Sequence, residues 1–178
     1  MKLQPFSSGV KKKIVAEIRA DVQCWRDQFK PDMDLAQACF HHAIIGAAHF
    51  NQRGIKAGVV GGSLWWPRIN MVDDDGKVMT HFSYVFDMAD PMTALALADN
   101  KMPEMHAWIV LSVRKEIVDL TTRYLKEQCK RCQGGEWIGA DPPDFLWVHQ
   151  DKMPKHIHYK PDARATGIVA QFARNTWG

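Results

Sequence analysis

The first thirty residues carry one apolar stripe at helical spacing. Intervals of four, four, four, three and four residues separate its members, which are Val10, Ile14, Ile18, Val22, Trp25 and Phe29. This spacing keeps them on one side of a helix and predicts an amphipathic helix behind Ser8. The helix is expected to end before Pro31, because proline disfavours helical backbone in the residue that precedes it.

A second segment is more uniformly apolar and predicts a helix over residues 34–53. Because it is apolar on most sides, we expect this helix to be central in the fold. Gly54 is expected to close it, since glycine readily adopts the left-handed backbone that ends many helices.

Beyond Gly54 the pattern changes to that of β-strands. Residues 58–66 form a β-rich run that is expected to end at Pro67. Residues 81–87 alternate in polarity and predict a half-buried strand. Between these two strands, the Asp-Asp-Asp-Gly cluster at residues 73–76 predicts a turn.

The strongest strand signals lie at residues 106–113 and 116–120, with Arg114 and Lys115 as a tight hairpin turn between them. Short helices are predicted within residues 90–104 and over residues 122–130. A last helix is expected to open at Pro161 and to run through Arg174.

Helices followed by a run of strands are typical of the α+β class, here with helices packed on an antiparallel β-sheet. The chain of 178 residues is 46% apolar and 24% charged, which suits a globular protein with one core. Since no repeat or convincing linker interrupts it, residues 1–178 are expected to form a single domain.

The net charge of +3 comes from interspersed basic and acidic residues, so a specific nucleic-acid partner is not expected. No segment reaches the run of about 18 apolar residues that a membrane span requires. The N-terminus also lacks the continuous apolar region of a signal peptide. We therefore expect a cytoplasmic protein with no membrane partner.

The four cysteines, Cys24, Cys39, Cys129 and Cys132, do not suggest a disulfide framework. In a reducing compartment, a single thiol becomes a candidate nucleophile. Cys39 is of most interest, because it lies near the start of the central predicted helix.

Four features follow one another along the chain: Cys39, RGIKAGVVGG at residues 53–62, HAW beginning at His106, and VDLTT around Asp119. Together they resemble the transglutaminase-like superfamily of papain-like cysteine enzymes. In that family the nucleophilic cysteine lies at a helix start, an R-G-I-like turn leads into the first strand, and HAW and D-x-T lie on adjacent strands. The resemblance covers residues 35–122 and implies a papain-like core.

The resemblance implies a catalytic triad of Cys39, His106 and Asp119. A helix N-terminus and a neighbouring imidazolium would favour the thiolate form of Cys39. His106 and Asp119 would face each other across the hairpin, so that the carboxylate orients the ring.

Such a thiolate would attack an amide or ester carbonyl and leave a thioester for water or an amine to resolve. The expected activity is that of a cysteine peptidase, an amidohydrolase or a transglutaminase-type acyltransferase. Its substrate would be a peptide, a protein or a small amide or ester, and no cofactor is expected.

Further residues are expected to support this chemistry. Gln37 is the preferred side-chain donor to the oxyanion, with Gln23 as the alternative. For Cys39 to lie at a helix start, residues 32–37 must be irregular or form a 3₁₀ helix. The candidates for an apolar substrate cleft, for which a core role is equally open, are Trp65, Trp66 and Trp108.

Each residue of the triad also has a purely structural interpretation. A free cysteine is often a small buried apolar residue, His106 could be satisfied within a strand, and Asp119 could close a turn. His41 and His42 are not expected to act as the base, because residues two and three positions along a helix do not point at the sulfur. A non-catalytic binding module on the same fold is therefore an alternative.

A third hypothesis comes from two short motifs in the second half of the chain. Cys129 and Cys132 form a C-x-x-C pair, and His156 and His158 form H-x-H. These four side chains would suit a zinc site, although their spacing is not standard. Such a site would make the protein a zinc-stabilised interaction domain, and the alternative is a helix end with two ordinary thiols. The leading hypothesis, the cysteine enzyme, needs no metal.

Overall fold

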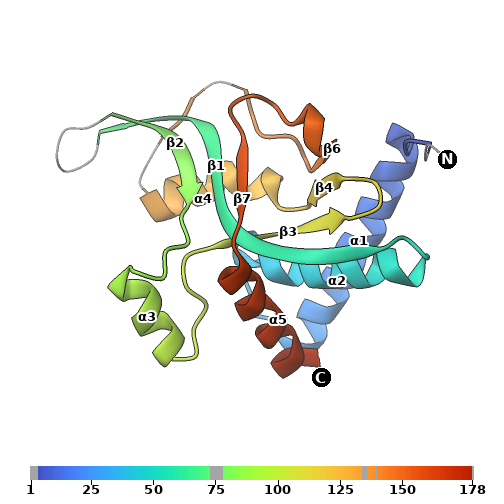
Figure 1. The fold of residues 1–178 in the computed structure, drawn as a ribbon, viewed down its shortest axis with the longest axis horizontal. Helices are drawn as coiled ribbons and strands as arrows, with labels where there is room; N and C mark the ends of the chain where they lie inside the picture. The colour runs from blue at the N-terminus through green and yellow to red at the C-terminus, as the bar shows by residue number, and fades with distance from the viewer. Residues whose placement is uncertain (1–3, 73–77, 134–135, 139, 178) are drawn as a thin grey trace. The chain divides into compact units, whose positions relative to one another are not determined.

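The computed structural model describes residues 4–72, 78–133, 136–138 and 140–177. It contains α-helices and antiparallel strands, which confirms the α+β class (Figure 1). The chain divides into two compact units. Unit 1 comprises Met1–Val59, Trp108–Tyr124 and Pro142–Met153, and unit 2 comprises Val60–Ala107, Leu125–Asp141 and Pro154–Gly178. The expectation of one domain stays a prediction.

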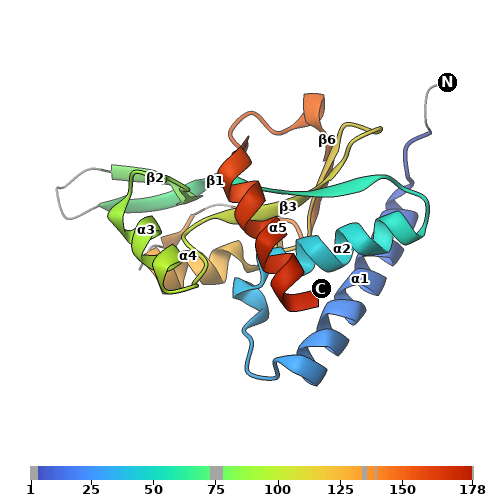
Figure 2. The ribbon, with the colours of Figure 1, turned by 60° about the horizontal axis from the view of Figure 1, so that its bottom comes forward.

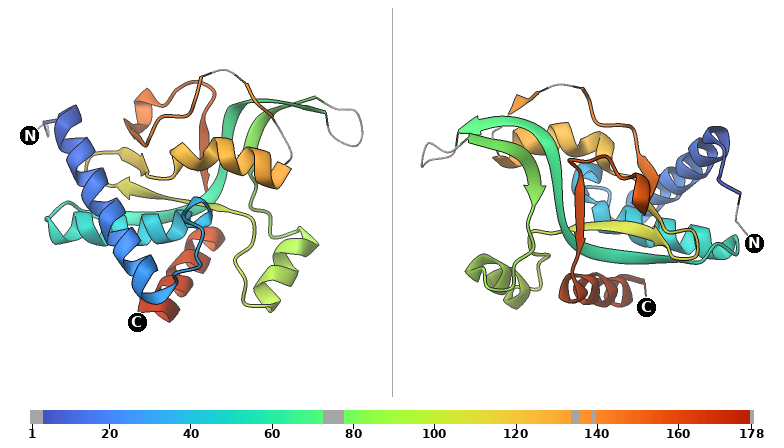
Figure 3. Two further views of the ribbon diagram at one scale, coloured as in Figure 1. Left: turned by 180° about the vertical axis from the view of Figure 1, so that it is seen from behind. Right: turned by 45° about the horizontal axis from the view of Figure 1, so that its top comes forward.

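Unit 1 begins with two helices that pack against each other. The first, α1, spans Ser8–Phe29, and the Ser7 side chain accepts a hydrogen bond from the Val10 N–H at 3.3 Å and caps it. The helix buries the middle of the predicted stripe at Ile14, Ile18 and Val22, whereas its ends, Val10 and Phe29, are exposed. It crosses the second helix (Figure 3, left). The predicted bounds are therefore confirmed to within a residue.

The second helix, α2, spans Cys39–Gln52 and follows a short 3₁₀ helix, η1, at Leu35–Gln37. The Asp34 carboxylate accepts a hydrogen bond from the Ala36 N–H at 2.9 Å and so starts η1. The predicted break before Cys39 is thus confirmed. Gly54 has a φ of 71°, which confirms its role in closing the helix.

The strands of unit 1 form an antiparallel ladder. β3 (His106–Leu111) enters the unit at Trp108 and pairs with β4 (Glu116–Asp119), which pairs with β6 (Leu146–His149). The hairpin turn has four residues, 112–115, and not the two predicted, and Lys115 at its end takes a positive φ of 51°. The short 3₁₀ helices η2 (Thr122–Tyr124) and η3 (Gln150–Lys152) complete the unit.

The helix α2 packs directly on the β3–β4 hairpin. Gly46 lies so close to it that an added Cβ would be 2.6 Å from Cδ1 of Ile109 and 3.2 Å from Cδ1 of Leu120. The absence of a side chain at Gly46 therefore sets how near the helix and the hairpin can approach.

Unit 2 is organised around the long strand β1 (Ala57–Val72), which enters it at Val60. β1 pairs antiparallel with β2 (Val78–Tyr84), β7 (His158–Pro161) and the short β5 (Glu136–Trp137). Figure 3, right, shows β1 and β2 as a paired ribbon. The prediction that the first strand ends at Pro67 is wrong, because a register shift between Pro67 and Met71 accommodates the proline.

The helices of unit 2 are α3 (Pro91–Ala98), α4 (Leu125–Gln133) and α5 (Ala163–Trp177). α3 and α4 confirm the two short helices predicted in these regions. Pro161 does not open α5 as predicted, because it is the last residue of β7. Figure 2 shows α5 as the last helix of the chain, drawn in red. The Asp162 carboxylate caps α5 instead, since its Oδ1 accepts from the N–H groups of Arg164 at 2.8 Å and Ala165 at 3.0 Å.

Two consecutive glycines in β1 are explained by close backbone contacts. A Cβ on Gly61 would lie 2.8 Å from the carbonyl group of Ala165, and a Cβ on Gly62 would overlap the carbonyl oxygen of Lys160. Part of the RGIKAGVVGG motif therefore has a packing role in seating α5 and β7.

The predicted turn at residues 73–76 lies outside the described residues. None of the helices in the described part of the chain is both long enough and apolar enough to cross a bilayer.

Candidate functional site

Cys39 is the first residue of α2 and is partly exposed. The residue before it, Ala38, caps the helix with no side-chain hydrogen bond, whereas Ser7 caps α1 and Asp90 caps α3 with side-chain oxygens. The positive end of the α2 dipole is therefore not neutralised by a capping side chain and lies at the Cys39 backbone.

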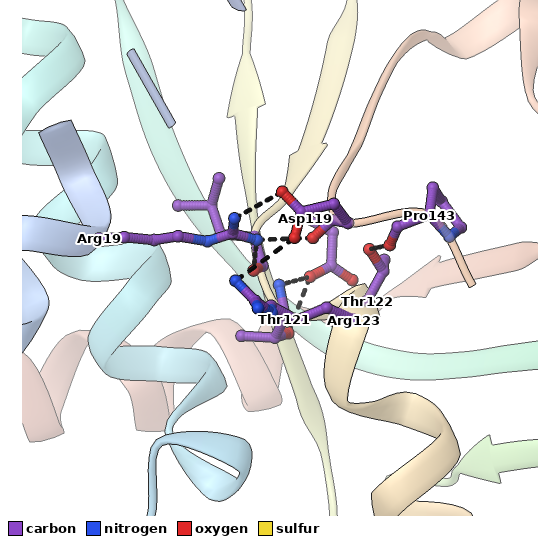
Figure 4. Close-up of polar contacts among 8 residues, drawn as sticks. Arg19, Asp119, Thr121, Thr122, Arg123 and Pro143 are labelled. Carbon is purple, nitrogen blue, oxygen red and sulfur yellow. Dashed lines mark hydrogen bonds and ion pairs between the residues drawn. The ribbon is translucent and has the colours of Figure 1, made fainter. Parts of the chain in front are cut away.

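Asp119 is the last residue of β4, and only 1% of it is exposed. Its Oδ1 accepts hydrogen bonds from the Thr121 N–H at 2.9 Å and from the Thr121 hydroxyl at 2.8 Å (Figure 4). These two donors fix the orientation of the carboxylate in the buried site. Thr121 is thus a positioning residue for Asp119.

Hydrogen bonds and ion pairs from polar side chains, together called the brace, hold the backbone that follows Asp119 (Figure 4). Arg19 donates from Nη2 to the Leu120 carbonyl at 3.2 Å and from Nη1 to the Asp144 carboxylate at 2.7 Å. Arg123 lies 3.3 Å from the same carboxylate, and the Thr122 hydroxyl donates to the Pro143 carbonyl at 2.7 Å. Sequence reasoning missed this brace, because its partners lie up to 125 residues apart.

His42 lies one helical turn beyond Cys39 and is buried. Its Nδ1 is 2.9 Å from the Ala38 carbonyl oxygen, a contact that requires the proton on Nδ1. Burial lowers the pKa of His42, and Arg19 and Arg123 add to that shift, whereas the hydrogen bond to Ala38 and the charge of Asp119 oppose it.

His41 is the second buried histidine of this turn, and its ring packs 4.8 Å from that of Trp25. Burial, with smaller contributions from His42 and Lys30, lowers the pKa of His41 from 6.5 to about 4. The unfolded chain therefore binds this proton more readily than the folded one. Both histidines are buried on α2, and their exclusion as the base stays a prediction.

Lowering the pH is expected to destabilise the protein through His41. Because the folded pKa is depressed, the stabilisation is complete above the unfolded pKa of 6.5 and is lost as the pH falls toward the folded pKa of about 4. When the pH falls from about 7 to about 5, the unfolding free energy of the natural protein should decrease by about 2 kcal/mol more than that of the His41→Phe variant. Urea unfolding at the two pH values measures this difference. A His156→Phe variant, changed at an exposed histidine, serves as the control, and an equal loss in all three proteins would contradict the assignment.

His106 begins β3, as predicted, and is buried within unit 2. Its ring stacks on Tyr84 with a centroid distance of 5.3 Å and an interplanar angle of 14°, and it lies 6.2 Å from the ring of Tyr159. Two aromatic rings therefore hold the imidazole in place.

The register of the hairpin corrects one predicted detail. Ile109 pairs with Val118, and extending this register by one pair sets Asp119 opposite Trp108. His106 was expected in that position. The predicted two-residue turn would have set Asp119 opposite Val110, so the longer turn brings the partner of Asp119 two residues nearer to His106.

The three candidate cleft tryptophans differ in exposure. Trp66 and Trp108 are buried, with 4% and 1% exposed, which favours a core role for both. Trp65 is half-buried, and its side chain lines an open groove within unit 2.

The two candidate oxyanion donors lie in different surroundings. Gln37 is the last residue of η1, is exposed, and has no side-chain hydrogen bond to another described residue. Gln23 donates its amide to both carboxylate oxygens of Asp27, at 2.8 and 2.9 Å. Gln37 is therefore the better placed of the two to offer an uncommitted amide.

The zinc hypothesis does not gain support. Cys129 is buried in α4, where burial raises the pKa of its thiol, and the Cys132 thiol contacts the Gln128 side chain at 3.2 Å. Among the residues that the structure describes, no three His, Cys, Asp or Glu side chains are grouped so that they could hold a metal ion. Cys129 and Cys132 therefore do not converge with His156 and His158.

Comparison with known proteins adds no relative to this picture. Scans against protein-family models, curated proteins and solved structures each give no match to the chain. The likeness to transglutaminase-like enzymes thus depends on the motifs around Cys39, His106 and Asp119 alone.

Proposed function

We propose that the protein is a cysteine acyl-transfer enzyme on a papain-like fold, with Cys39 as nucleophile, His106 as base and Asp119 as the residue that orients the base. The observation that carries the proposal is the local geometry of unit 1. The helix α2 starts at Cys39 and packs at Gly46 on the β3–β4 hairpin, whose second strand ends at Asp119.

Strand geometry supports the role of His106. His106 and Trp108 are two residues apart in β3, so their side chains take the same face of the strand. The register sets Trp108 opposite Asp119, so His106 lies on the strand face that carries the partner of Asp119.

In the proposed reaction, His106 takes the thiol proton and the Cys39 sulfur attacks the carbonyl carbon of an amide or ester. The C=O electrons move onto the oxygen, and the Cys39 N–H at the open start of α2, with the Gln37 amide, would donate to this oxyanion. The oxyanion then collapses, the bond to the leaving group breaks, and His106 returns the proton to the departing nitrogen or oxygen. Water or an amine attacks the remaining thioester and releases the sulfur.

The thiols of this chain provide a direct test. Cys24 and Cys132 are exposed, whereas Cys39 is only partly exposed. If accessibility alone governed alkylation, Cys39 would react more slowly than either. We expect iodoacetamide at neutral pH to label Cys39 at least about tenfold faster, as judged by mass spectrometry of the digested protein. Faster labelling of the exposed Cys24 and Cys132 than of Cys39 would contradict the proposal.

A further inference from the structure

An open groove of about 600 Å³ lies within unit 2, between the end of β2 and the start of α5. Its floor comes from the face of β1 that carries Ser63 and Trp65. The adjacent residues Leu64 and Trp66 point to the other face and are buried. Tyr84 and Tyr159 pair with Leu64, so the two rings that contact His106 lie on that buried face. The groove is therefore separate from the surroundings of His106.

One wall of the groove is apolar and partly exposed. Val85 is 42% exposed and Met88 is 37% exposed, and the half-buried Trp65 lines the groove with them. Apolar side chains gathered in a concave site favour a ligand with an apolar group.

The opposite wall carries two cations, Lys160 and Arg164. Within the described part of the chain, neither side chain has an ion-pair or hydrogen-bond partner. The groove also contains two carboxylates, but each is engaged with backbone N–H groups. Asp87 accepts from Ala89 at 2.8 Å, and Asp162 caps the start of α5. The groove is formally neutral, but its carboxylates are already hydrogen-bonded, so the charged groups left to meet a ligand are the two cations.

We propose that this groove is a second, non-catalytic site that binds an acidic peptide segment, with an apolar side chain against Trp65, Val85 and Met88 and a neighbouring carboxylate against Lys160 and Arg164. This charge complementarity is the feature that selects the ligand. A groove of this volume accommodates a few peptide residues. The site goes beyond the proposed acyl transfer, since it requires neither Cys39 nor His106.

A phosphate-bearing ligand fits the same groove less well. Phosphates are favoured at a helix start where the N–H groups are open. At α5 the Asp162 carboxylate already occupies these donors and would repel a dianion. A single carboxylate carries less charge and needs only the two side-chain cations.

Three acetylated, amidated peptides test the proposal against the full-length protein by NMR titration. The first has phenylalanine followed by one glutamate, the second has glutamine in place of the glutamate, and the third has alanine in place of phenylalanine. The first peptide should shift the amide signals around residues 63–65, 85–88 and 160–164. Each of the other two should bind about tenfold more weakly.

The variant Lys160→Glu/Arg164→Glu is expected to lose binding of the first peptide while keeping its fold. Both side chains are exposed, and glutamate is well tolerated in the first turn of α5. Lys155→Glu, a reversal of an exposed lysine outside the groove, is the matched control and should bind normally. Equal binding of the glutamine peptide, equal loss in the control, or shifts produced by inorganic phosphate but by no peptide would each overturn the proposal. A Cys39→Ala protein should bind the first peptide unchanged, so failure of the catalytic proposal would leave this result intact.

Discussion

Replacing His106 with alanine is expected to slow alkylation of Cys39 at neutral pH by about 100-fold, because the thiol loses the group that would accept its proton. Labelling of the variant should recover only at higher pH, where hydroxide removes the proton. The measurement is the iodoacetamide rate at Cys39 as a function of pH, with Cys24 in the same molecule as an internal reference.

Two further proteins make this result specific. His158→Ala removes an exposed histidine from the same unit and should leave the Cys39 rate unchanged. His106→Gln keeps a planar polar side chain between the rings of Tyr84 and Tyr159, so it should fold normally yet lose the same reactivity. If His106→Gln reacts as fast as the natural protein, His106 is not the base.

The Gly62→Ala variant is expected to lose about 3 kcal/mol or more of unfolding free energy. Its methyl group would meet the carbonyl oxygen of Lys160 and, at 3.0 Å, the amide nitrogen of Asp162. Both contacts are with backbone, so no rotamer change relieves them. β7 must move away from β1, which also disturbs the cap of α5 that Asp162 provides.

Gly58 offers a matched control on the same strand, because a Cβ there would meet no atom within 4 Å. The Gly58→Ala variant should change the unfolding free energy by less than about 1 kcal/mol. Urea unfolding followed by far-ultraviolet circular dichroism measures both variants. Similar stability for the two would show that β7 does not approach β1 as closely as described.

The helices were predicted well because their signals are local. The stripe on α1, the left-handed Gly54 and the break before Cys39 each follow from residues a few positions apart. β6 and β7 were missed for the opposite reason. Each has four residues, and their pairing with β4 and β1 is decided by partners far along the chain.

The candidate site shows the same division. Sequence placed Cys39 at a helix start and His106 and Asp119 in neighbouring strands, because these positions follow from motifs with their own secondary structure. It did not predict that Thr121 orients Asp119 or that Arg19 holds the backbone after it. It left open whether Trp66 and Trp108 line a cleft or the core, and their burial favours the core, since the packing of strand faces decides which aromatic rings are buried.

The interleaving of the two units has a consequence for synthesis on the ribosome. The chain leaves unit 1 after Tyr124 and returns to it only at Pro142, so β6 emerges after the whole of α4. Until then, the edge of β4 that β6 will cover has no strand beside it. A nascent chain stalled before Leu146 would therefore expose this edge to other polypeptides, and a molecule shortened at that point would be prone to aggregate.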